Sequence, residues 1–155
     1  MIKAKFNIDD IINGIEDELE AVIEDIVLAM QQSCLEVVTM ARNLPSPSGM
    51  MRGTPHQPNY IDDTGYLRAS IGYAIYRDGQ LLHQDFTQLG ESSSKATADE
   101  VAAQYRDGIV AVIVAGADYA AAVASKGYDV ISGSSMQLKD IFQGYIEMVK
   151  QVHGL

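Results

Sequence analysis

The chain has 155 residues, and its apolar fraction of 47% and charged fraction of 21% match an ordinary globular protein, which excludes a wholly disordered chain. It carries 11 basic and 21 acidic residues, a formal net charge of −10. That charge argues against binding to nucleic acid or to an anionic membrane surface, because both require clustered Lys and Arg.

Residues 1–43 are predicted to form a long acidic amphipathic helix, the first part of a single domain over residues 1–155. No Lys or Arg occurs between Phe6 and Ala41, where acidic residues are dense. Two interpretations stay open: the acidic face is solvated over a core stripe, or part of the helix packs on another subunit or faces an acidic channel. The apolar stripe recurs at alternating three- and four-residue steps through Ile8, Ile12, Ile15, Leu19, Val22, Ile26 and Met30.

This stripe predicts how substitutions in the helix behave. Asp in place of Leu19 or Val22 should cost several kcal/mol, because it would bury an unpaired charge in whatever packs there. Gln in place of Glu16, Glu20 and Glu24 should leave the fold intact. Self-association, if it occurs, is expected to use the apolar stripe or the sheet edges.

Residues 44–63 follow as a Pro-rich segment that holds all four prolines. Proline this dense excludes regular structure, so an extended loop is predicted. The Ser-rich residues 90–96 are predicted to be a second loop. We expect residues 46–59 and 90–96 to be the least ordered internal stretches, because neither has an apolar period with which to pack.

Residues 64–155 are predicted to hold a sheet and a closing helix. Strands are expected at 68–76 and 81–86, joined by an Asp-Gly turn. The run 109–115 is apolar on both faces, which favours a central strand with Val112 and Ile113 largely buried. Residues 128–131 favour a short edge strand.

Helix signals complete this part of the chain. Thr97 opens a capping box, which predicts a helix to about Tyr105, and residues 118–125 predict a further short helix. Ser134 with Gln137 is expected to cap the last helix. The expected fold class is therefore α+β, with a long N-terminal helix, a mainly antiparallel sheet of three to four strands, a short middle helix and a C-terminal helix.

The residue types of catalytic and metal sites are not arranged in any recognised pattern. None of the three histidines, His56, His83 and His153, has a second ligand at helical spacing. The single cysteine, Cys34, lies on the apolar stripe, where an activated thiolate is not expected, and it fits a reducing compartment. We expect no catalytic residue, no cofactor, no metal and no enzyme activity.

The chain also lacks the sequence signals of export and of membrane insertion. No stretch approaches the roughly 18 apolar residues of a membrane-spanning helix. The N-terminus lacks the apolar core and cleavage site of a signal peptide. We therefore expect a soluble protein that makes no use of a membrane.

Two segments resemble signatures of the tail-completion, or head–tail joining, proteins of long-tailed bacteriophages. Residues 62–73 are similar to the Thr-Gly-x-Leu-Arg-x-Ser-Ile segment of that family. Residues 116–131 are similar to its second signature, in which a Tyr-Ala pair is followed by Val-Glu and then Gly. This chain has Ala124 where the family has Glu, and Gly127 lies one position later. The order of elements along nearly the whole chain also matches.

The resemblance implies a structural protein of a phage or prophage virion, located in the virion and in the host cytoplasm during assembly. It implies a ring of identical subunits at the neck that contacts other head or tail proteins, without sequence-specific binding to nucleic acid. For Arg68, an ion pair with Asp62, Asp63 or the acidic helix and a contact between subunits both stay open. The residues of interaction that the resemblance implies are Thr64, Gly65, Leu67, Arg68, Tyr119, Ala120 and Gly127.

An alternative function is a soluble module that docks on another protein through its acidic amphipathic helix. A hydrolase that uses the Ser-rich loops is a third interpretation. Ring formation in solution would separate the first two functions.

Overall fold

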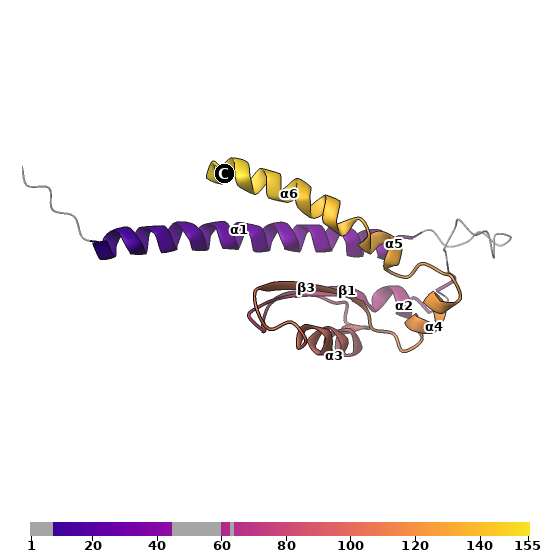
Figure 1. The fold of residues 1–155 in the computed structure, drawn as a ribbon. Helices are drawn as coiled ribbons and strands as arrows, with labels where there is room; N and C mark the ends of the chain where they lie inside the picture. Colours follow the sequence, from indigo (N-terminus) through magenta and orange to yellow (C-terminus); the bar gives the residue numbers. More distant parts are fainter. Residues whose placement is uncertain (1–7, 45–59, 63) are drawn as a thin grey trace, which may run out of the picture.

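The computed structural model describes residues 8–44, 60–62 and 64–155. Its first element, α1 (Ile8–Arg42), is the longest helix of the described chain and confirms the predicted N-terminal helix (Figure 1). Most of the predicted Pro-rich loop, including the expected disorder of residues 46–59, lies outside the described residues.

Three strands form one antiparallel sheet in the order β2-β1-β3. The middle strand, β1 (Ile71–Arg77), pairs with β2 (Gln80–Asp85) on one side and with β3 (Ile109–Ala115) on the other. The β1–β2 hairpin turns at Asp78 and Gly79, whose φ angles of 51° and 79° lie in the left-handed region that a tight hairpin uses. The predicted Asp-Gly turn is confirmed.

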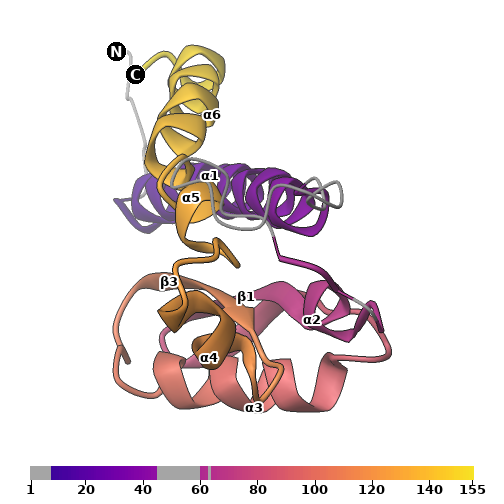
Figure 2. The same cartoon turned by 90° about the vertical axis from the view of Figure 1, so that its right-hand side faces the viewer.

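Both faces of β1 are buried, and they face different helices. Ile71 and Ile75 lie in one core cluster with Cys34 of α1. Ala74 and Tyr76 lie in a second cluster with residues of α3 (Glu91–Ala102). Figure 2 shows the resulting order of layers, with α1 above the sheet and α3 below it. β1 and β3 are therefore covered on both sides, which explains their largely apolar sequences, whereas β2 stays exposed.

The last helix, α6 (Leu138–His153), packs on the side of α1 that faces away from the sheet (Figure 1). No residue of α6 is fully buried. At its end, His153 Nε2 lies 2.7 Å from Asp25 Oδ2. Nearer its start, the Tyr145 hydroxyl donates to the carboxylate of Glu36. The expected α+β class is thus confirmed, and the described residues form three strands, within the three to four that were expected.

The predicted loop at residues 90–96 is wrong, because these residues begin α3, and the predicted capping box at Thr97 lies inside that helix. The buried face of α3 consists of the small side chains Ser94, Ala98 and Ala102. Small side chains let a helix approach a sheet closely, and they contribute little to an apolar period. The sequence pattern of this helix therefore resembled that of a polar loop.

The run 109–115 is a strand as predicted, but β3 is at the edge of the sheet and not in the centre. Val112 is buried as expected, whereas Ile113 is only half-buried. Apolar residues on both faces indicate that two layers cover a strand. Such a pattern does not show whether the strand has a hydrogen-bonded neighbour along one edge or along both edges.

Three local predictions are also wrong. Residues 66–69 form a short helix, α2 (Tyr66–Ala69), so the first strand starts at Ile71 and not at 68. Residues 128–131 form no strand, although Val130 is buried in the core that α1 covers. Ser134 lies in α5 (Ser132–Ser135), and Gln137 precedes α6 without a side-chain capping bond. The predicted short helix at 118–125 is confirmed as α4 (Ala120–Ser125).

Candidate interaction site

The end of α1 is joined to the start of β1 by the guanidinium group of Arg42. Its Nε and Nη2 atoms donate to the carbonyl oxygen of Ile71 at 2.9 and 2.7 Å. Its Nη1 atom lies 3.4 Å from Asp85 Oδ2, on the neighbouring strand. Arg42 is the only basic residue of α1. It lies in the last turn, where a positive charge suits the helix dipole.

Arg68 also binds the C-terminal end of α1. Its Nη1 atom donates to the carbonyl oxygen of Arg42 at 3.2 Å, and its Nη2 atom donates to the carbonyl oxygen of Leu44. The last carbonyl groups of a helix lack partners within the helix, so a guanidinium group placed here supplies donors that the chain needs. The structure thus gives Arg68 a role within one subunit.

Asp62 and Gly65 shape the chain before Arg68. The Asp62 carboxylate accepts from the backbone N–H groups of Leu67, at 3.4 Å, and Arg68, at 2.9 Å. Gly65 has a φ of 71°, a conformation that strains residues with a side chain. Thr64 Oγ1 accepts from the N–H of Tyr66 at 3.3 Å. The first signature therefore builds a capped turn that presents α2.

The second signature meets the first through aromatic and apolar contacts. The rings of Tyr66 and Tyr119 lie 6.3 Å apart between centroids, with a tilt of 41°. Leu67 and Ala120 are both buried in the core cluster that α1 covers. Tyr119 keeps 42% of its surface exposed. An open cavity of about 510 Å³ lies beside this pair and is lined by Ile61, Asp62, Thr64, Tyr66 and Tyr119.

Six of the seven residues that the resemblance implied lie within residues 64–68 and 119–120, two stretches that meet through Tyr66 and Tyr119. Gly127 has a different role. It ends α4, with a φ of 85° and an N–H that donates to Ala124 O at 3.0 Å. Arg42 and Asp62 complete this arrangement and were not predicted as site residues. The sequence held a signal for each. Arg42 is an isolated basic residue at the end of an acidic helix, and Asp62 is an aspartate shortly before the start of a helix.

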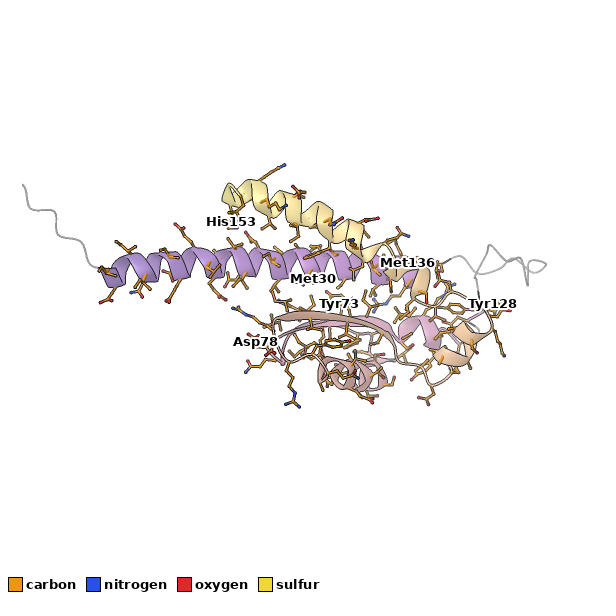
Figure 3. The ribbon with its side chains drawn as sticks, viewed as in Figure 1. Met30, Tyr73, Asp78, Tyr128, Met136 and His153 are labelled. Carbon is orange, nitrogen blue, oxygen red and sulfur yellow. The ribbon has the colours of Figure 1, made fainter. Side chains whose placement is uncertain are left out.

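The first part of α1 is a second candidate surface. We call residues 8–19 the N-terminal arm, because both neighbouring layers stop beside its base. The hairpin ends where Arg77 Nη1 lies 2.5 Å from Glu20 Oε1, and α6 ends where His153 meets Asp25. Figure 1 shows the arm running past both layers, and Figure 3 shows its side chains pointing outward and His153 at the end of α6.

The apolar residues of the arm are exposed. Their exposed fractions range from 47% for Ile12 to 64% for Ile8, and Leu19 is 59% exposed. The prediction that Leu19 is packed is therefore wrong within one subunit. Val22, one turn further along the helix, is half-buried. Glu20 also differs from a purely solvated residue, because its bond to Arg77 holds the pKa of its carboxyl group below the ordinary value.

Among the residues that the structure describes, no group of three His, Cys, Asp or Glu side chains could hold a metal ion. No helix in the described ranges combines the length and the apolar character needed to cross a bilayer. Burial raises the pKa of the Cys34 thiol to about 12, which keeps it in the unreactive thiol form near neutral pH.

Comparison of the chain with protein-family models, with curated proteins and with solved structures finds no match.

Proposed function

We propose that this chain is a structural protein of a phage or prophage virion, similar to tail-completion or head–tail joining proteins. In this proposal it assembles into a ring at the neck between head and tail, contacts other head or tail proteins, and has no catalytic activity and no cofactor. It would occur in the host cytoplasm during assembly and then in the virion.

The observation that carries the proposal is the meeting of the two signature segments at Tyr66 and Tyr119. These segments lie far apart in the chain, yet residues of both line one open cavity. Arg42 ties the end of α1 to β1 and Arg68 ties it to α2, both through backbone carbonyl groups, so the first signature is held in place. A rigid, partly aromatic surface suits contact between subunits.

The exposed arm supports the alternative function, a module that docks on another protein through its acidic helix. Both functions use protein contacts and no chemistry. They differ in whether the chain associates with itself, and a closed ring needs two different surfaces on each subunit.

Purified protein tests the proposal by sedimentation and native mass spectrometry over a range of concentrations. A single closed oligomer that electron microscopy resolves as a ring is the expected result. A monomer at every concentration would favour the docking module.

A matched pair of variants then tests the surface. Tyr119→Ala should weaken the oligomer by roughly tenfold or more, which is the loss of one aromatic contact at an interface. Tyr105→Ala is the control, because Tyr105 is also exposed, at 57%, and belongs to neither signature. If both variants weaken the oligomer equally, the surface around Tyr119 is not a contact between subunits.

A further inference from the structure

The apolar residues of the N-terminal arm follow a heptad pattern. In the usual notation, positions a are Ile12 and Leu19, and positions d are Ile8, Ile15 and Val22. All but Val22, at the base of the arm, are at least 47% exposed. A contiguous apolar seam of this kind on a charged helix is typical of a surface that another helix covers.

The layers that pack on the rest of α1 end before this seam does. The salt bridge from Arg77 to Glu20 marks the last contact with the hairpin, and the contact of His153 with Asp25 marks the end of α6. At ~1.5 Å per residue, the arm extends roughly 18 Å past the contact at Glu20, and further past the contact at Asp25. The seam is thus accessible along its length to a helix from outside the subunit (Figure 1).

The charges beside the seam indicate what that helix is. Positions e are Asp9 and Glu16 in the arm and Ile23 at its base, and positions g are Ile11 and Glu18. In a parallel pair of arms, each g residue faces the e residue five positions later on its partner. Ile11 then faces Glu16, and Glu18 faces Ile23. No acidic residue of these rows meets another.

An antiparallel pair of arms places e residues against e residues instead. Asp9 and Glu16 occupy this row, so every antiparallel register within the arm brings carboxylates together. Like charges that face one another destabilise a helix pair. The same helix therefore fits a second copy of itself in one direction only.

We infer that the arms of three or more copies of this chain pack as a parallel helical bundle through the Ile8–Ile12–Ile15–Leu19 seam. Isoleucine or leucine at a with isoleucine at d favours three or four strands over two. Rotation about an axis along the arms makes all copies parallel, as closed cyclic symmetry requires. The inference adds a contact surface to the proposed ring. It rests on the proposed function in one respect, which is that both require the chain to self-associate.

Sedimentation of two matched variants of the full chain tests the seam. Leu19→Asp should weaken self-association by roughly tenfold or more, because it places a charge in the bundle core. Leu28→Asp is the control, since Leu28 is similarly exposed on the same helix, at 51%, but lies off the seam. At concentrations where the parent is monomeric, both variants should keep its circular dichroism and melting temperature. Equal association of both variants would overturn the inference, even if rings still form.

Salt gives an independent measurement on the parent protein. Bundled arms bring the acidic residues of several chains near one another, and salt screens that repulsion. Raising the sodium chloride concentration should therefore strengthen association that runs through the arms. Weaker association at high salt would contradict the inference.

Disulfide trapping tests the direction. In a Cys34→Ala background, Ile8→Cys and Leu19→Cys are introduced in separate chains. A parallel bundle should let each variant cross-link to its own copies. An antiparallel one should give only the mixed product of the two variants. Mixed products alone, or no cross-linked product, would overturn the inference. Self-linked arms without rings would instead leave it standing and contradict the proposed function.

Discussion

At the scale of single residues, two glycines predict opposite results for the same substitution. A Cβ atom on Gly144, inside α6, meets nothing within 4 Å, whereas one on Gly116 would lie 2.5 Å from the backbone of Ser94. Gly144→Ala should raise the free energy of unfolding by about 0.5–1 kcal/mol. Gly116→Ala should lower it by about 1–3 kcal/mol, because the backbone of α3 must move. Urea unfolding measures both, and a stable Gly116→Ala protein would show that α3 packs less closely than described.

Cys34 predicts how stability depends on alkaline pH. Burial raises the pKa of its thiol from the ordinary 9.0 to about 12. Below pH 9 both the folded and unfolded chains keep the proton, so the thiol has no effect there. Between about pH 9 and 12 the unfolded chain releases the proton first, so the free energy of unfolding falls as the pH rises.

Urea unfolding of Cys34→Ala and of the parent on either side of pH 9 isolates this effect. Tyr76 also has a raised pKa, from burial and from its bond to Asp99, and it contributes equally to both proteins. The variant should lose less stability with rising pH than the parent does. Identical losses would mean that the thiol ionises as easily in the folded chain as in the unfolded one.

At the scale of elements, the joint between the end of α1 and α2 depends on the planar fork of Arg68. Its guanidinium group donates to two carbonyl oxygens, those of Arg42 and Leu44. A lysine ammonium lacks this fixed geometry, so Arg68→Lys should lower the free energy of unfolding by about 1–3 kcal/mol. Arg106→Lys is the control, because exposed Arg106 donates only weakly, at 3.5 Å, to Ala103 O in its own turn. Equal stability of the two variants would show that the bonds from Arg68 to the end of α1 do not stabilise the fold.

At the scale of the whole molecule, charge predicts behaviour toward DNA. The net charge is −10, and acidic residues are dense along α1. Without a basic stripe no counterions are released from DNA, so we expect no measurable binding to duplex DNA at physiological salt. Fluorescence anisotropy with labelled duplex tests this. A sub-micromolar complex would contradict the charge argument.

The sequence alone determined the features that depend on local periodicity and turn chemistry. The heptad-like stripe from Ile8 to Met30 predicted α1, alternation predicted the β1–β2 hairpin, and Asp78-Gly79 predicted its turn. Each signal lies within a few residues of the structure it specifies. The two signature segments were also identified from sequence, although their meeting at Tyr66 and Tyr119 was not.

Only the tertiary structure decided how these pieces combine. The small residues of α3 became a helix face because the sheet accepts them closely, and β3 became an edge strand because its far side pairs with no described strand. One stripe on α1 is also divided in two. Beyond Glu20 it is progressively covered by the sheet and α6, and before it the isoleucines stay exposed. Periodicity shows which face of a helix is apolar, but the lengths of the neighbouring elements decide how much of that face is covered within one subunit.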